Sequence, residues 1–379
     1  MKIIRPEAEH GIVHRYPLDN VFRYNGWPSV ARDERGVLYV AASTMRISHG
    51  DPSGKDGMWL SFNDGKTFTP TILINDTYYD DRDTGITYIG DGRLIFTFYT
   101  EAAADNWSRL QSAEWLKAPG KAMAGGYTEM WKVLPDSDRD RLTGSFYMIS
   151  DDYGVTWSER RYIEVFAPHG VSQCKDGSLI YLGKVDFRIN GPDAGHEPIA
   201  MMTSHDRGET WEMTGYVPLP HDLDDFSYVH EPHVVELPNG RLLGAMRVHA
   251  RKVVPENTTY ITFSDDKGKT WSEPKEIVGV DGMPPHILVH SSGAIVLVYG
   301  CRTPGIRSER AVVSYDNGET WTEQYILDDN INEEKQFDLG YPASVELDDG
   351  TIFTVYYQGL PEDEDTSVLY TKWKLGEKK

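Results

Sequence analysis

Short apolar runs, joined in pairs by a turn that contains glycine, return six times along this chain. An example is SVARDERGVLYVAAS at 29–43, where apolar residues occupy both arms and Gly36 stands at the turn. Runs of this length with glycine between them are typical of β-hairpins. The other five copies lie at 85–99, 170–184, 233–247, 286–300 and 343–357. We therefore expect an all-β fold of repeated units, each with one such hairpin as its two inner strands.

A second repeat of eight residues follows each of the first five hairpins. It reads Ser-x-Asp-x-Gly-x-Thr and then an aromatic residue, and we call it the eight-residue repeat. Asp and Gly supply turn chemistry, and the aromatic ring is expected to pack on the next strand. The copies begin at Ser61, Ser150, Ser204, Ser264 and Ser314, and only the first departs from the pattern, with Asn63 for Asp and Phe68 for Trp. Each copy is expected to join strands three and four of one unit.

Six four-stranded units in one chain predict a six-bladed β-propeller, a single domain spanning residues 1–379. The sixth hairpin is followed only by SVLYTKWKLGE, which supplies one more strand. The strand-like segment EHGIVHRYPL near residue 13 has no other partner. We expect this N-terminal strand to complete the sixth blade, because closure of the ring removes the free edges of an open sheet.

One insertion interrupts the rhythm of the repeats. The first two copies, at Ser61 and Ser150, stand 89 positions apart, whereas later copies are 50 to 60 apart. The excess falls at about 101–132, in the loop between strands two and three of the second blade, where Trp107, Leu110 and Trp115 have helix-like spacing. Long loops on rigid scaffolds often carry function. We expect this insertion either to cover a site as a lid or to form a contact between copies of the chain in a homo-oligomer.

The overall charge and the cysteines narrow the classes of partner. A formal net charge of -21 repels phosphate backbones and anionic lipids, so we expect neither a nucleic acid nor a membrane as partner. Cys174 and Cys301 lack metal-ligand spacing and are expected to be reduced thiols. The first residues lack the apolar core of a signal peptide, which predicts a cytoplasmic protein. Because no zinc or calcium motif is present, we expect no metal and no cofactor.

Polar and aromatic residues gather where the inner strands reach one face of the predicted ring. In a propeller, the first strand of each blade begins and the second ends on the same face, near the axis. Ionisable side chains collected around one axis indicate a binding site. The residues expected to bind substrate there are Trp27, Arg46, His49, Arg82, His230, Arg247, His286 and Arg302.

The eight-residue repeat closely resembles the Asp box of sialidases and other BNR-repeat propellers. In that family the boxes lie on the face away from the active site. Two further segments, HEPHVVELPNGRLLGAMR and LGYPASVELDDGTIFTVYY, resemble the sialidase segments that carry a glutamate and a tyrosine. The resemblance implies that Tyr341 is the nucleophile and that Glu231 accepts its proton. A phenol needs such a neighbour because its ordinary pKa is near 10.

The general acid is less well defined by the sequence. The family places an Asp between the first blade's second strand and the first box, where this chain offers Asp51 and Asp56, and we favour Asp51 beside His49. A second group of carboxylates, Asp80, Asp81 and Asp83 around Arg82, begins the second blade. Crowded carboxylates raise one another's pKa, so Asp83 is also a catalytic candidate. The group could equally grip sugar hydroxyls or brace the axis.

Two positions depart from the sialidase pattern together. Sialidases begin the first blade with an Arg that grips the sugar carboxylate, and this chain has Trp27 after Gly26 there. The Glu that supports this Arg is replaced by Tyr357. Arg46, Arg247 and Arg302 could still bind a carboxylate in bidentate fashion. We therefore expect a changed specificity pocket.

The resemblance implies an exo-glycosidase that releases a terminal sugar, acidic sugars included, from a carbohydrate substrate. A second hypothesis is an inverting hydrolase or a lyase that uses the carboxylates at 80–83 with a histidine such as His169, His230 or His286. A third is a glycan-binding propeller without catalysis, since a fold by itself implies no activity.

Overall fold

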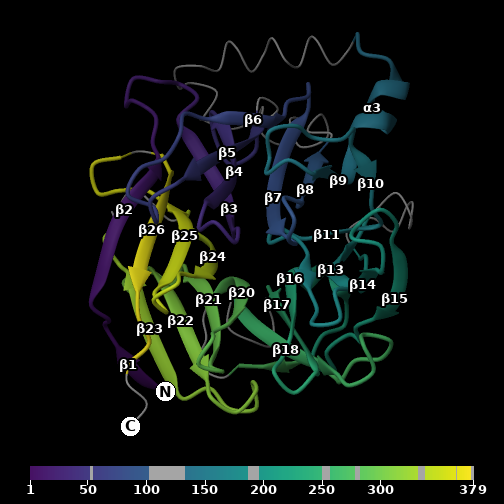
Figure 1. The fold of residues 1–379 in the computed structure, drawn as a ribbon, viewed down its shortest axis with the longest axis vertical. Helices are drawn as coiled ribbons and strands as arrows, with labels where there is room; N and C mark the ends of the chain where they lie inside the picture. Colours follow the sequence, from purple (N-terminus) through teal and green to yellow (C-terminus); the bar gives the residue numbers. More distant parts are fainter. Residues whose placement is uncertain are drawn as a thin grey trace.

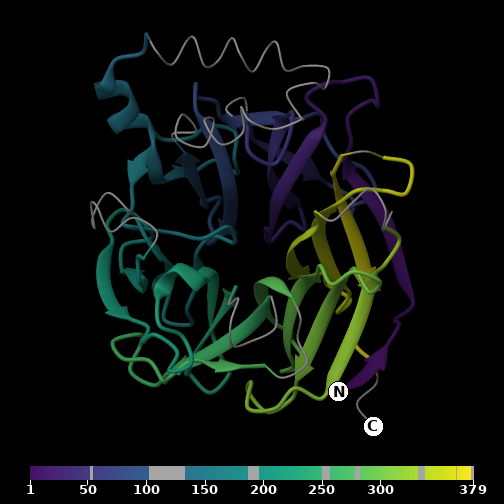
Figure 2. The same ribbon diagram turned by 180° about the vertical axis from the view of Figure 1, so that it is seen from behind.

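Six β-sheets stand around a central axis in the computed structural model, which confirms the predicted six-bladed propeller (Figure 1). The structure describes residues 1–51, 54–101, 133–186, 196–249, 257–277, 282–331, 338–363 and 365–376. Figure 2 shows the same ring of sheets from behind. Strands joined by hairpins within a blade are antiparallel.

The first three blades follow one another in sequence. Blade 1 contains β3 (Tyr24–Arg32), β4 (Leu38–Arg46), β5 (Lys55–Ser61) and β6 (Ile72–Asn75). Blade 2 contains β7 (Asp80–Tyr88), β8 (Leu94–Glu101), β9 (Gly144–Ser150) and β10 (Arg161–Tyr162). Blade 3 contains β11 (Val165–Phe166), β12 (Ser172–Gln173), β13 (Leu179–Val185), β14 (Ile199–Ser204) and β15 (Glu212–Tyr216).

The other three blades complete the ring. Blade 4 contains β16 (Val229–Glu236), β17 (Leu242–Val248), β18 (Thr258–Ser264) and β19 (Lys275–Glu276). Blade 5 contains β20 (Met283–Val289), β21 (Ile295–Cys301), β22 (Ser308–Ser314) and β23 (Glu323–Asp328). Blade 6 contains β24 (Gly340–Glu346), β25 (Ile352–Gln358) and β26 (Ser367–Trp373).

The N-terminal segment closes the ring, as the sequence predicted. Strand β2 (Ala8–His14) pairs antiparallel with β26, and Figure 1 shows the purple β2 beside the yellow β26. The sequence did not predict β1 (Lys2–Ile4), which runs parallel to β23 and adds a fifth strand to blade 5. The N-terminal segment therefore pairs with both of the last two blades.

Helix contributes little to the described residues. Besides the 3₁₀ turn η3 (Phe226–Tyr228), there is α3 (Asp136–Leu142), which lies outside blade 2 in Figure 1. Neither helix is long and apolar enough to cross a membrane, and the same is true of every helix among the described residues. The predicted insertion at 101–132 lies outside the described residues, apart from Glu101.

Each eight-residue repeat folds into the same hydrogen-bonded turn between strands three and four. In the third copy, Ser204 Oγ accepts the Gly208 N–H at 2.8 Å, and Asp206 Oδ1 and Oδ2 accept the N–H and hydroxyl of Thr210 at 2.9 and 2.6 Å. Gly208 has φ +90°, and a Cβ there would stand 2.7 Å from Ile95 Cδ1 of the preceding blade. Glycine is therefore required both by the backbone and by the blade contact.

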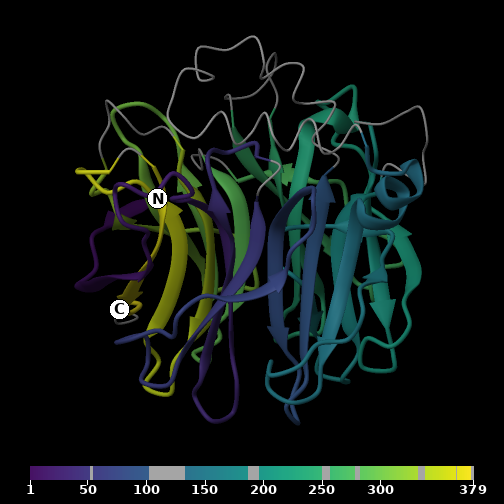
Figure 3. The same cartoon turned by 90° about the horizontal axis from the view of Figure 1, so that it is seen from above.

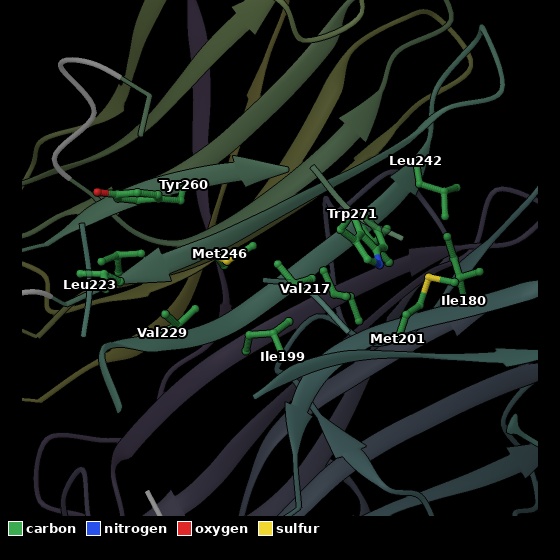
Figure 4. Close-up of a cluster of buried hydrophobic side chains, with 13 residues drawn as sticks. Ile180, Ile199, Met201, Val217, Leu223, Val229, Leu242, Met246, Tyr260 and Trp271 are labelled. Carbon is green, nitrogen blue, oxygen red and sulfur yellow. The ribbon is translucent and has the colours of Figure 1, made fainter. Parts of the chain in front are cut away.

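Apolar residues form one buried cluster at each junction between neighbouring blades. Figure 4 shows the cluster between blades 3 and 4, where Ile199 and Met201 on β14 pack against Val229, Met246 and Trp271. Comparable clusters lie at the other five junctions. Both arms of each hairpin are apolar because both faces of each sheet are covered by neighbours. Seen from the side, the strands run between two opposite faces of the ring (Figure 3).

Candidate active site

Five inner strands carry a bulge near the axis, and in four of them the bulge redirects the side chain of one residue with a positive φ. The register of the inner pair shifts where each strand begins, between Arg82 and Gly85 on β7, for example. The bulged residue has a positive φ, which is uncommon outside glycine and concentrates at functional sites. These residues are Trp27 (φ 53°), Asp83 (58°), Glu231 (48°) and Tyr341 (52°), from blades 1, 2, 4 and 6. The bulges thus bring together four residues that the sequence proposed for one site.

Tyr341 and Glu231 meet as the sequence predicted. The Tyr341 hydroxyl donates to Glu231 Oε1, and Arg247 Nε lies 3.1 Å from Glu231 Oε2. Burial disfavours the charged form of Glu231, but Arg247 and His230 outweigh it, and the pKa of Glu231 is lowered. Burial and the Glu231 charge raise the pKa of Tyr341 well above 10. The phenol therefore keeps its proton and shares it with an ionised carboxylate.

Asp83 supplies a second carboxyl, whose pKa is shifted in the opposite direction from that of Glu231. Burial raises its pKa to about 6, Arg82 opposes this rise, and the charges of Glu231 and Asp80 add to it. Arg82 Nε lies 3.5 Å from Asp83 Oδ2. Two neighbouring carboxyls, one ionised and one protonated near pH 6, form the arrangement that separates a general acid from a nucleophile or base. Asp83 therefore combines a raised pKa with a position near Glu231, as a general acid requires.

Asp51 and Asp56, the two acids that the sequence suggested, serve the loop and the blade junction. The Asp51 side chain accepts the Ile47 N–H, its own N–H donates to Asp80 Oδ2 at 3.3 Å, and the residue is 2% exposed. Asp56 is fully buried and accepts hydrogen bonds from Ser43 Oγ and Asn75 Nδ2. Burial, with the Asp81 charge, raises the pKa of Asp56 well above its usual value.

Trp27 forms the apolar floor of the site. Its side chain is fully buried, and the guanidinium carbons of Arg46 and Arg82 lie 4.6 and 4.3 Å from its ring centre. Its ring also lies 6.3 Å from those of Tyr341 and Tyr357. Among the described residues, none accepts a hydrogen bond from its indole N–H. An aromatic floor thus occupies the position at which the sialidase pattern has an Arg.

Each predicted arginine already faces a carboxylate. Arg46 Nη1 lies 2.7 Å from Asp80 Oδ1, and Arg82 Nη1 lies 3.0 Å from Glu101 Oε2. These guanidiniums brace blades 1 and 2 beside Trp27. Arg302 pairs in the same way with Asp338, a residue that the sequence analysis did not select.

Each oxygen of the Asp338 carboxylate has two polar side-chain partners. Its Oδ1 accepts the Tyr357 hydroxyl at 2.6 Å and lies 3.1 Å from Arg302 Nη2. Its Oδ2 accepts the Tyr24 hydroxyl at 2.5 Å and His49 Nδ1 at 2.9 Å. Burial disfavours its charge, but His49, Arg302 and Tyr24 outweigh burial and hold the pKa of Asp338 far below its usual range. Asp338 is therefore a fixed anion between blades 1, 5 and 6.

The two predicted histidines of blades 4 and 5 differ in position. His230, beside Glu231, lies 2.8 Å through Nε2 from the Ser227 carbonyl, and burial lowers its pKa to about 3. His286 instead stacks on His233, with ring centres 4.3 Å apart, and lies 5.3 Å from His169. These three rings line a cavity further along the axis. The structure thus places His286 in a separate histidine cluster.

A positional signal in the sequence would have found the missed residues. Tyr24 stands three positions before Trp27, as Asp80 stands before Asp83 and Asp338 before Tyr341. The same offset in three blades places a polar group where each inner strand enters the site. Within the described residues, no group of three or more His, Cys, Asp or Glu is arranged to hold a metal ion.

Several solved structures share this architecture. A Dyadobacter fermentans protein of unknown function has a TM-score of 0.74 at 19% identity, covering 98% of this chain and 99% of that one. The Ruminococcus gnavus intramolecular trans-sialidase has 0.66 at 15% identity, covering 96% and 97%. The Penicillium chrysogenum α-L-arabinanase has 0.64 at 15%, covering 98% and 99%. Likeness at these identities is likeness of fold.

Sequence comparison gives a family. No curated protein sequence matches the chain. The model of the BNR repeat-like domain matches residues 99–354, which is more than half of the chain. The six-bladed propeller agrees with that match. This chain therefore belongs to the BNR repeat-like domain family.

Proposed function

We propose that this protein is a glycoside hydrolase that releases a terminal sugar, with Tyr341, Glu231 and Asp83 as its catalytic residues. The observation that carries the proposal is the pairing of an ionised Glu231, bonded to the Tyr341 hydroxyl, with a neighbouring Asp83 whose pKa is raised to about 6. The similarity in fold to a trans-sialidase and an arabinanase supports the same class of reaction.

The chemistry follows from the lowered pKa of Glu231 and the raised pKa of Asp83. Asp83 in its protonated form gives its proton to the leaving oxygen as the glycosidic bond breaks. The Tyr341 oxygen attacks the anomeric carbon while its proton passes to Glu231, which avoids the cost of a free phenolate. Water, deprotonated by Asp83, then attacks the same carbon and releases the sugar, and Glu231 returns the proton to Tyr341. The products are one sugar and one alcohol for each water consumed.

The raised pKa of Tyr341 favours a second version of the mechanism. Because Glu231 is ionised, its carboxylate could attack directly, with the Tyr341 hydroxyl as a hydrogen-bond donor. The Tyr341→Phe variant separates the two versions. If Tyr341 is the nucleophile, this variant loses turnover by orders of magnitude, whereas a supporting donor contributes about tenfold.

The test is hydrolysis of a panel of aryl glycosides by the wild type and by Asp83→Asn and Glu231→Gln. We expect each variant to lose about 10²- to 10⁴-fold in kcat. Wild-type activity should fall as pH rises through about 6, where Asp83 loses its proton, and Asp83→Asn should lack that limb. His205→Gln, at an exposed position of the third eight-residue repeat, is the control. Variants that all stay within a few fold of wild type would contradict the proposal.

A further inference from the structure

We infer that the site selects an uncharged sugar and that Asp338 sets this specificity by filling the place of a substrate carboxylate. The inference rests on the proposed function, because it names the substrate class of that same site.

The described residues of the site leave no guanidinium free for an anionic substrate. Each of the four arginines lies 2.7 to 3.1 Å from a carboxylate oxygen of the protein. The arginines are Arg46, Arg82, Arg247 and Arg302, and the carboxylates are Asp80, Asp83, Glu101, Glu231 and Asp338. With Asp83 protonated as the general acid, four carboxylates face the four guanidiniums, and the charges balance. A further anion in this setting finds no uncompensated partner.

Lys184 does not change this balance. It is 4% exposed, and its ammonium donates to the carbonyls of Phe226 at 3.2 Å and Val229 at 3.3 Å. Burial lowers its pKa despite the nearby Glu197. It therefore braces the junction of blades 3 and 4.

Asp338 already forms an ion pair with Arg302, the arginine beside Tyr357. Arg302 Nε donates to the Leu339 carbonyl at 2.8 Å, and Nη2 donates to the Tyr357 hydroxyl at 2.7 Å and faces Asp338 Oδ1. Asp338 in turn has two partners on each oxygen, so its own acceptor capacity is satisfied. A substrate carboxylate could reach Arg302 only by displacing this bound carboxylate.

The aromatic residues beside Asp338 reinforce the selection. Trp27 and Tyr357 stand where the sialidase pattern has the carboxylate-binding Arg and its supporting Glu, and both are fully buried. With Tyr24 and Tyr341 they form one apolar cluster. An ionised group placed against these rings would lose hydration without a compensating charge.

The test compares matched substrates that differ in charge alone. Aryl hexosides and the corresponding aryl hexuronides differ at one carbon, which is CH₂OH in the first and COO⁻ in the second. We expect the wild type to favour the neutral member by at least about 100-fold in kcat/KM, with aryl pentosides accepted and a sialoside not accepted. Equal or better use of the anionic members would overturn the inference.

Asp338→Asn adds a direct test of the residue. Removing this charge leaves Arg302 without its anion, so the neutral-to-anionic preference should shrink by about tenfold or more, mainly through KM for the hexuronide. Asp338→Glu, which restores the charge, should recover the preference. The matched control is Asp33→Asn, which removes another buried carboxylate that binds an arginine, Arg35, and a tyrosine, Tyr39. An unchanged preference in Asp338→Asn would also contradict the role of Asp338.

The wild-type comparison holds even if the Asp338 variants fail to fold. If the wild type turns over no glycoside of either charge, the proposed function fails on its own, and calorimetry with free hexoses and hexuronates then decides the inference. Binding of the neutral sugar alone supports it. Binding of the hexuronate, or of neither sugar, overturns it.

Discussion

Asp83→Asn should make the protein more stable at alkaline pH. The Asp83 carboxyl is largely removed from water near the charges of Glu231 and Asp80, and Arg82 offsets only part of this cost. Asparagine has nearly the same shape, carries no charge, and tolerates the positive φ of this position. The substitution thus removes the cost of a desolvated charge without creating a cavity.

The magnitude follows from the pKa of Asp83. A carboxyl with an ordinary value of 3.8 is raised to about 6 in the folded protein. Because the folded value is the higher one, the stability that Asp83 contributes is complete below 3.8 and is lost as pH rises through about 6. This difference corresponds to about 3 kcal/mol, at about 1.36 kcal/mol for each pH unit. The asparagine side chain does not titrate, so the variant should be close to wild type at about pH 4 and more stable by up to about 3 kcal/mol at about pH 8.

Urea unfolding of both proteins at about pH 4, 6 and 8 measures this difference. Carboxyls distant from Asp83 titrate in both proteins alike, so they cancel when the two free energies of unfolding are subtracted. A free-energy difference that does not change between the lowest and the highest pH would refute the assignment of a raised pKa to Asp83. A variant that is less stable at the highest pH would show that the Asp83–Arg82 pair outweighs burial.

Two further predictions concern the ring itself. Gly85→Ala would place a Cβ closer to the backbone of Gly170 in the next blade than real Cβ atoms come. We expect urea titration to show a loss of at least about 1 to 3 kcal/mol in the free energy of unfolding. Gly376→Ala should be nearly neutral, because its Cβ would meet only the Tyr325 hydroxyl at 3.4 Å. Removal of residues 1–14 deletes β2 and exposes the edge of β26. We expect this truncation to lower the free energy of unfolding by at least about 5 kcal/mol and to cause aggregation. Removal of residues 1–5 deletes only β1 and should lower the free energy of unfolding less. Equal urea midpoints for Gly85→Ala and wild type, or for the two truncations, would contradict these contacts.

Much of the candidate site could be read from the sequence because strand ends recur at fixed places in each blade. Glu231 and Tyr341 were selected in this way, with the family resemblance assigning their roles, and the structure brings them into contact. Asp338 was missed because it lies before its strand, where only its offset of three positions from Tyr341, shared with Tyr24 and Asp80, marks it. Its partners Tyr24, His49 and Arg302 come from blades 1 and 5, so nothing local indicates that these groups meet.

By itself the sequence determined the number of blades, the turn chemistry of the eight-residue repeat and the strand that closes the ring. These features are local, because glycine and aspartate set a turn within a few residues and apolar strands need only a neighbouring sheet. The tertiary structure decided which carboxyl has the tuning of an acid and which arginines are already paired. Those properties depend on burial and on charges within a few ångströms, and here the interacting groups come from different blades, such as Asp83 from blade 2 and Glu231 from blade 4.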